Sequence, residues 1–449
     1  MTITWPRMKI AALLFLAAMA CAAAMGGYFP FGGTGAALSC FFLFLLTAAV
    51  RPTRREWGLG AIPAALFAFF KAVGYSYDTT DSYGLLLKNA KTLLSGALAM
   101  AALFAAALCA VILLFRLLDA LRVCAVSDTP ATKAEKRRLF WLCAGLIFAG
   151  SIPYLILYAP GLNIFDTHDQ ILQFFGFPSY IGDGSALSDH HPVFLTVVYG
   201  GFMKLGLLLG DANLGQLLYS LASMAALALC WAYALVTLRE LGLARGAALG
   251  LAAFVALYPV LALYAFNMCK DVSVEPFVLL YGTMMLKLYA TDGQIAGRKR
   301  FCAALFAVAM MMMLTRKPAM YALCFAALFL ALGFRGFRVR LAGVLLGAAA
   351  AFVGLYSGAL LPACGVIPGE TREMLSIPFQ QTARYLIAYP DDVTQAEMDA
   401  VSAVLDVEHA TQNYDPRLAD PVKDTSSPEL SGPLAPYMKA WASMGLRHP

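Results

Sequence analysis

Long apolar runs separated by short polar segments dominate this chain. A run of about 17–25 apolar residues is long enough for a helix to cross a bilayer. Because hydrocarbon offers the backbone no hydrogen-bond partner, each such run is predicted to be a helix. The sequence contains roughly twelve of them, at 9–28, 34–50, 57–74, 92–118, 139–159, 192–210, 213–238, 246–266, 272–290, 301–314, 318–334 and 340–361.

The polar stretch YAPGLNIFDTHDQILQFFGFPSYIGDGSALSDHHP (158–192) interrupts these runs and gathers many titratable groups. At about 100° per residue, Asp166 and Asp169 share one side of a helix. The apolar residues fall on the opposite side. A short amphipathic helix along a membrane surface is therefore predicted, with its carboxylates toward water or protein. Gln170 and Gln173 accompany the carboxylates, and the opposite side carries Ile171, Leu172, Phe174 and Phe175.

Composition places the chain among membrane proteins. Of its 449 residues 61% are hydrophobic and 13% charged, whereas a soluble domain has about 25% charged residues. The predicted fold class is an all-α membrane protein, a polytopic bundle of roughly 11–13 transmembrane helices with outer-face juxtamembrane helices. Neither a zinc-like pattern nor a phosphate loop is present, and the net charge of +6 does not indicate nucleic acid, because the basic residues lie in short clusters between apolar runs.

The ten cysteines are scattered, and most lie inside apolar runs. The chain contains no CxxC motif. Buried free thiols are the usual outcome of such a distribution, so no disulfide framework is predicted.

Basic loops predict the orientation, because positive residues prefer the cytoplasmic side. Clusters at 51–55, 133–138 and 335–340 mark cytoplasmic loops, which places the 160–190 loop outside. Arg239, Arg245 and the cluster at 298–300 also favour the cytoplasm, but two full crossings between 192 and 238 would put Arg239 outside. Either one of those two runs does not cross or this loop breaks the rule. We favour the basic loops.

Three regions follow from this orientation: N-terminal transmembrane helices (1–138), a transmembrane core with the outer loop 160–191 (139–361), and an extracytoplasmic tail (362–449). In the tail, Thr394 and Glu397 form a capping-box pattern that opens a helix. The stretch 413–433 is predicted to be loop, and a further helix begins at 434–446. No closing structure is evident, so the C-terminus could be incomplete.

Asp166 and Asp169 are the first candidates for chemistry. A carboxylate at the membrane surface can act as a general base toward an acceptor hydroxyl. Two carboxylates could instead hold a divalent cation through oxygen ligands. Ordinary solvated acids on a loop helix remain the alternative.

Three further polar pairs are candidates for binding. In SDHHP (188–192), Ser188 or Asp189 suits a helix N-cap, while His190 and His191 could bind a phosphate or line a substrate path. The second pair, Lys270-Asp271, lies between two apolar runs, where charges usually face protein or a watery cavity, although a local ion pair capping the helix is the simpler explanation. The third pair is Arg316-Lys317. On the outer face an Arg-Lys pair matches phosphate oxygens, unless the orientation is reversed and the pair is a plain cytoplasmic anchor.

The order of these motifs resembles the GT-C membrane glycosyltransferases, which include protein O-mannosyltransferases and the lipid A aminoarabinose transferase. It is more similar still to an uncharacterised bacterial multi-pass family related to them. The resemblance covers about Leu155 to the C-terminus and is carried by PGLNIFDTHDQ (160–170), SDHHP (188–192), NMCKD (267–271), LTRKP (314–318), IPFQQTARY (377–385) and DPVKD (420–424).

The resemblance implies transfer of a sugar from a polyprenyl-phosphate donor to a lipid or glycan acceptor of the cell envelope, at the outer face of the cytoplasmic membrane. By the family's pattern Asp166 would be the base, and Arg316 and Lys317 would hold the leaving phosphate. A single displacement would invert the anomeric carbon. Alternatives are a transporter or flippase of a lipid-linked anionic substrate and a non-catalytic scaffold. A transporter would need two related halves, and no internal repeat is evident.

Overall fold

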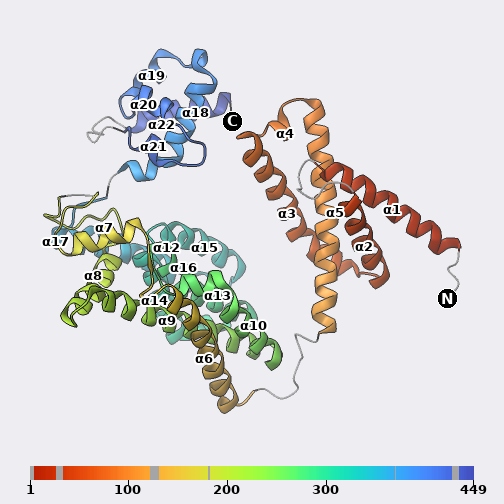
Figure 1. The fold of residues 1–449 in the computed structure, drawn as a ribbon, viewed down its shortest axis with the longest axis horizontal. Coiled ribbons are helices and arrows are strands. Elements are labelled where there is room, and N and C mark those ends of the chain that lie inside the picture. The colour runs from red at the N-terminus through yellow and green to blue at the C-terminus, as the bar shows by residue number, and fades with distance from the viewer. Residues whose placement is uncertain are drawn as a thin grey trace. The chain divides into compact units, whose positions relative to one another are not determined.

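The computed structural model describes residues 5–26, 34–121, 131–180, 183–369, 371–426 and 434–448. It divides into two compact units, Met1–Ala125 and Val126–Pro449. The described residues are helical apart from turns, loops and two strands of two residues each (Figure 1). Each predicted apolar run coincides with a helix or a helix pair, which confirms the all-α class.

Small residues let the helices of the first unit approach closely. Ala18, Ala72 and Ala99 are fully buried where the helices meet. Arg116 and Glu56 tie the last long helix to the third through an ion pair of 2.8 Å. The helices are α1 (Trp5–Met25), α2 (Thr34–Val50), α3 (Arg54–Thr80), α4 (Gly84–Leu87) and α5 (Ala90–Ala120).

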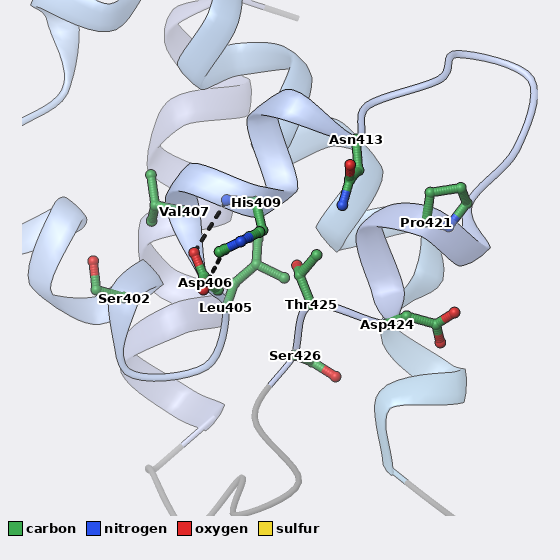
Figure 2. A pocket seen from close by; sticks show the side chains of 10 residues that line it. All are labelled: Ser402, Leu405, Asp406, Val407, His409, Asn413, Pro421, Asp424, Thr425 and Ser426. Atoms are coloured by element: carbon green, nitrogen blue, oxygen red, sulfur yellow. Dashed lines mark hydrogen bonds and ion pairs between the residues drawn. The ribbon is translucent and has the colours of Figure 1, made fainter.

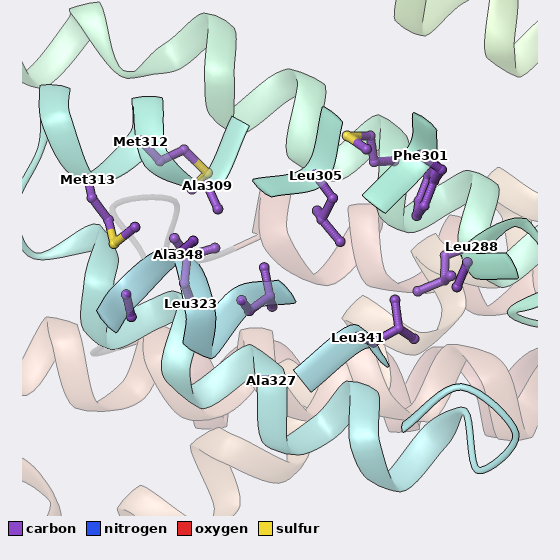
Figure 3. Packing of buried hydrophobic residues seen from close by; sticks show 14 of the residues in the cluster. Leu288, Phe301, Leu305, Ala309, Met312, Met313, Leu323, Ala327, Leu341 and Ala348 are labelled. Atoms are coloured by element: carbon purple, nitrogen blue, oxygen red, sulfur yellow. The ribbon is translucent and has the colours of Figure 1, made fainter. Parts of the chain in front are cut away.

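The second unit contains the membrane-type core and the tail. Figure 3 shows part of its largest apolar cluster, where Leu305, Met313 and Leu341 are fully buried. The core helices are α6 (Lys133–Leu157), α8 (Val193–Leu208), α9 (Ala212–Glu240), α10 (Arg245–Leu257), α11 (Pro259–Ala265), α13 (Glu275–Ala290), α14 (Lys299–Thr315), α15 (Ala319–Gly333), α16 (Arg338–Ala351), η2 (Phe352–Leu360) and α17 (Leu361–Ala363).

One end of this core gathers basic loops. Lys136 Nζ lies 2.8 Å from Glu240 Oε1, which joins the start of α6 to the end of α9. The end of α13 joins them, because Lys287 Nζ donates to Tyr233 Oη (2.9 Å) and lies 3.8 Å from Glu240. The start of α16 lies here too, because Arg340 Nη1 donates to Ala296 O (3.0 Å). We call this the basic end; it comprises residues 133–138, 239–245, 298–300 and 338–340.

The opposite end gathers the polar segments. Strand β1 (Leu162–Asn163) pairs in parallel with β2 (Asn267–Met268), joining the residues after α6 to those after α11. Asn163 Nδ2 donates to Gln216 Oε1 of α9 (3.0 Å). The chain after α17 also returns here, because Ile367 N donates to Leu187 O (2.8 Å). We call this the polar end; it comprises 160–163, 187–191, 267–271, 316–317 and 366–367.

Helix α8 starts and finishes at the polar end. Its first residue, Val193, lies two positions after His191, which contacts Lys270, and its last turn packs on the start of α9. A Cβ on Gly206 would lie 2.2 Å from Gly215 N, so only glycine allows this approach. Gln216, next to Gly215, accepts from Asn163 Nδ2 of the polar end (3.0 Å), so the last turn of α8 lies there too. The run 192–210 therefore starts and finishes at the polar end, and α9 alone passes from the polar to the basic end.

This arrangement resolves the conflict over Arg239. The sequence left open whether one of the two runs between 192 and 238 fails to cross. The contacts place Arg239 beside Glu240 at the basic end, with 133–138, and identify α8 as the run that does not traverse the core.

The run 246–266 differs from the prediction of one continuous helix. Helices α10 and α11 meet at 71°. Pro259 begins α11, and a proline disfavours the helical conformation of the residue before it and removes a backbone donor. Among the described residues, five helices are long and apolar enough to cross a membrane, or six with this bent pair as one span.

The tail forms its own small core. Phe379 and Tyr437 are fully buried against each other, and the predicted capping box at Thr394 and Glu397 is present. Arg447 donates to both carboxylate oxygens of Glu397, each at 2.9 Å, and these bonds lower the pKa of Glu397 to about 2. The helices are α18 (Ser376–Ala388), α19 (Gln395–Ser402), α20 (Val407–Gln412), α21 (Asp420–Lys423) and α22 (Leu434–Arg447).

Two expectations for the tail need correction. The stretch 413–433 is not all loop, because α21 lies within it; residues 427–433 lie outside the described part. The last helix does close a structure: α22 buries Tyr437 and Met444 in the tail core, and Arg447 ties it to α19.

We expect Gly215→Ala to destabilise the α8–α9 hairpin. A Cβ there would lie 2.4 Å from Phe202 O, and such overpacking costs about 1–3 kcal/mol. The apparent unfolding temperature of the purified full chain should fall. Gly201→Ala on α8 is the matched control, since a Cβ there meets nothing within 4 Å. Equal behaviour of the two variants would contradict the close packing.

Candidate functional site

Helix α7 (Phe165–Phe174) turns its polar face into the protein. Gln170 Nε2 donates to Thr196 Oγ1 (3.1 Å), and Gln173 Oε1 accepts from Ser188 N (3.0 Å). Thr167 donates to the carbonyl of Met268. The predicted amphipathic helix is present, with its polar side packed against α8 and β2 rather than facing water. Phe165, at its start, remains 65% exposed.

This anchoring points the Asp166 carboxylate toward Lys270, in the polar segment 267–271. Asp166 Oδ2 lies 2.5 Å from Lys270 Nζ, in the short helix α12 (Lys270–Ser273). The same Nζ lies 2.9 Å from His191 Nδ1. A lysine ammonium can only donate, so Nδ1 accepts and the imidazole proton is on Nε2. Lys270 therefore joins the start of α7 to the residues just before α8.

Two further ion pairs continue from this one. Arg316, which caps the end of α14, pairs with Asp271. Lys317 Nζ lies 3.1 Å from Asp189 Oδ2 and also donates to the Asp189 carbonyl. We name these three cations and three carboxylates the cation–carboxylate cluster: Lys270, Arg316 and Lys317 with Asp166, Asp271 and Asp189.

Burial and charge set the protonation states here. Burial raises the pKa of Asp166, but the hydrogen bond and charge of Lys270 outweigh it and hold that pKa below its ordinary value. Burial raises the pKa of Asp189 above its ordinary value despite Lys317. Burial, with the charge of Lys270, lowers the pKa of His191 to about 3. His191 is therefore a neutral acceptor at pH 7.

Hydrogen bonds from two tyrosine side chains fix helix α12 in place. Ser273 Oγ lies 2.7 Å from Tyr199 Oη of α8 and 2.9 Å from Tyr219 Oη of α9. Tyr199 is fully buried and Tyr219 nearly so. Because Ser273 is in the same turn as Lys270 and Asp271, these bonds fix the backbone that carries both charges.

The structure brings together most of the site residues that the sequence predicted. Asp166, His191, Lys270, Asp271, Arg316 and Lys317 all lie at the polar end. The ring of His190 lies 4.7 Å from that of His191, and its backbone N donates to Ser188 Oγ (3.2 Å). Lys270 and Asp271 do not pair with each other, so the simple local ion pair considered for them is wrong.

Asp169 is not brought into the cluster. It is buried on the inner face of α7, and its Oδ1 accepts from Tyr180 N (3.3 Å). Sequence reasoning missed the partner of Asp189, which it assigned to capping. It also missed Ser273, Tyr199 and Tyr219, since a tyrosine inside an apolar run gives no signal of its role.

No group of three or more His, Cys, Asp or Glu side chains within the described ranges is arranged to hold a metal ion. The three carboxylates of the cluster each face a cation instead.

A polar pocket of about 780 Å³ lies in the tail (Figure 2). Asp406 and His409 are paired across 2.8 Å at its wall. Asp424, at its margin, accepts from Tyr180 Oη (3.3 Å), so the pocket adjoins the loop that follows α7. Its lining residues are Ser402, Leu405, Asp406, Val407, His409, Asn413, Pro421, Asp424, Thr425 and Ser426.

Residues 181–449 match the model of a family described as a family of unknown function, DUF6020. The match covers more than half of the chain, and the chain belongs to this family. It includes every cation of the cluster and begins after Asp166. No curated protein matches the chain, and no solved structure matches it. The resemblance to GT-C glycosyltransferases stays a prediction.

We expect His191 to make stability sensitive to acid. Its folded pKa of about 3 lies below the unfolded value of about 6.5. Between those values the unfolded chain binds more protons, so stability falls as pH decreases from 6.5 toward 3. His191→Gln should remove about 1–2 kcal/mol of the stability loss between pH 7 and pH 5. Unfolding temperatures at both pH values measure this.

His168→Gln is the control, because His168 is an exposed histidine of α7. That variant should keep the pH dependence of the unmodified chain. An unchanged dependence in His191→Gln would contradict a neutral, buried His191.

Proposed function

We propose that the protein is a membrane glycosyltransferase that moves a sugar from a polyprenyl-phosphate donor to a lipid or glycan acceptor of the cell envelope. The observation that supports this best is the cation–carboxylate cluster. It gathers Lys270, Arg316 and Lys317 with a carboxylate at one end of an apolar bundle. A lipid-borne phosphate reaches such a site from the adjoining hydrocarbon.

The three cations suit a phosphate. Arg316 offers a planar fork of donors, and the two lysines add point charges. In the absence of donor, each cation faces its own carboxylate, so the cluster is close to neutral. We propose that the donor phosphate takes the place of those carboxylates, which spreads the leaving-group charge over the cations.

Asp166 would then act as the base. Its low pKa keeps it ionised at neutral pH, and loss of Lys270 to the phosphate frees its oxygens. The acceptor hydroxyl gives its proton to Asp166 while its oxygen bonds to the anomeric carbon. The bond from that carbon to the phosphate oxygen breaks, and the electron pair leaves with the phosphate. One displacement inverts the anomeric centre.

The proposed setting is the cytoplasmic membrane, with the polar end outside. Basic loops favour the cytoplasm, and those of the second unit meet at the basic end. In this proposal every predicted run except α8 crosses the membrane, which gives roughly eleven crossings. Among the described residues Cys364, beyond α17 and near the polar end, is the exposed cysteine. An impermeant thiol reagent should reach it from outside intact cells.

A transporter or flippase of an anionic lipid-linked substrate is the second candidate. The 71° break between α10 and α11 favours it, since transporters place substrate at discontinuous helices. The charged cluster lies at one end of the core, however, and not halfway along it. Flux of a labelled lipid-linked sugar across vesicles, without sugar transfer, would support the transporter instead.

Asp166→Asn should reduce transfer of radiolabelled sugar from polyprenyl phosphate in membrane vesicles by about 100-fold or more, because it removes the general base. Membrane insertion should be unchanged. Asp183→Asn is the control: among the described residues, this exposed carboxylate accepts from Ser185 N within its own turn (2.9 Å) and has no cation partner. Undiminished transfer by Asp166→Asn would remove the proposed role of Asp166.

Asp271→Asn should bind geranyl phosphate more tightly than the unmodified chain, because Asp271 competes with phosphate for Arg316. Both side chains are partly exposed, so about a threefold change is expected. Arg316→Gln should weaken binding. Equilibrium binding to the detergent-purified protein measures both. Weaker binding by Asp271→Asn would contradict the competition and indicate that Asp271 itself contacts the ligand.

A further inference from the structure

A second hollow lies at the basic end, about 37 Å along α6 from the polar end by the rise of 25 helical residues. It measures about 630 Å³ and is lined by residues from the first two turns of α6. Their spacing puts them on one side of the helix. They are Lys133, Ala134, Arg137, Arg138 and Trp141.

The cations of this hollow lack an internal counter-ion. Glu135 accepts from Thr132 N (2.7 Å) and Thr132 Oγ1 (3.0 Å), and Glu240 pairs with Lys136. Both carboxylates are thus engaged away from the hollow. Among the residues that the structure describes, the side chains of Lys133, Arg137 and Arg138 have no hydrogen bond and no ion pair within the protein. Three exposed positive charges within two turns repel one another unless an anion lies between them.

An aromatic side chain follows the cations along the helix. Trp141 is 60% exposed, and indole rings favour the boundary between headgroups and hydrocarbon. The order of cation and then indole along this face matches the order of phosphate and then glycerol and acyl chain in a phospholipid.

We infer that this hollow binds the headgroup of an anionic phospholipid on the basic side of the membrane. The phosphate lies between Arg137, Arg138 and Lys133, and the upper acyl chain lies against Trp141. The complementary charge favours an anionic lipid over a zwitterionic one, and the exposed indole of Trp141 favours a lipid over a free phosphate. The inference requires only that α6 lies in a membrane, so it is independent of the proposed transferase activity.

Quenching of Trp141 fluorescence by brominated lipid tests the site. The full chain is reconstituted in vesicles of phosphatidylcholine containing a minor fraction of brominated phosphatidylglycerol or, separately, brominated phosphatidylcholine. Subtracting the signal of Trp141→Phe isolates this indole. Each cation near an anionic surface contributes up to about fivefold in affinity. We expect phosphatidylglycerol to be preferred at Trp141 by about tenfold or more, and this preference should fall to about fivefold or less after Arg137→Gln with Arg138→Gln, since Lys133 remains.

Arg298→Gln with Arg300→Gln is the matched control. It removes two cations from another cluster of the basic end and should keep the preference. Equal quenching of the unmodified chain by the two lipids would overturn the inference, and this comparison needs no charge variant. If the control variant lost the preference equally, the preference would come from the overall positive charge of the basic end and not from a site, which would also overturn the inference. Loss of the preference in 10 mM inorganic phosphate, added at constant ionic strength, would assign the hollow to a soluble phosphate and also overturn the inference.

Discussion

The ion pair between Asp166 and Lys270 is the contact on which the site depends. It joins α7 to α12, two segments 104 residues apart in the chain. The pair forms because burying either charge alone in the apolar core is costly, and because other contacts already fix the backbone near Asp166 and the backbone near Lys270. Strand β1 pairs with β2 beneath it, and Ser273 holds α12 to two buried tyrosines. Lys270 then positions His191, and Asp271 positions Arg316.

Helix lengths decide which charges can meet. Helices α6, α9 and α14 pass from one end of the core to the other, so the polar residues beyond them collect at the ends. Charges inside an apolar bundle are costly unless paired or hydrated. Helix α8 is the exception in its course, because its tight glycine contact with the start of α9 keeps both of its ends at the polar end. Without that return, Arg239 and Glu240 would lie at the polar end instead of beside Lys136 at the basic end.

The sequence predicted the helices well, because run length and apolar character alone determine them. It also predicted the convergence of Asp166 with Lys270 and Arg316, since polar residues between spans must lie at helix ends. The break at Pro259 was missed, although a proline within an apolar run is a signal that could have found it. The buried polar face of α7 was not predictable, because its partners Thr196 and Ser188 become neighbours only in the fold. The pairing of Asp189 with Lys317 was hidden for the same reason.

A cryo-EM map of the full chain in a lipid nanodisc tests this account most directly. The account predicts continuous side-chain density linking Asp166 to Lys270 and Asp271 to Arg316, all on the bilayer face opposite to Lys136 and Glu240. A map with Asp166 and Arg316 on opposite faces of the bilayer, or on one face with no shared cavity, would contradict it.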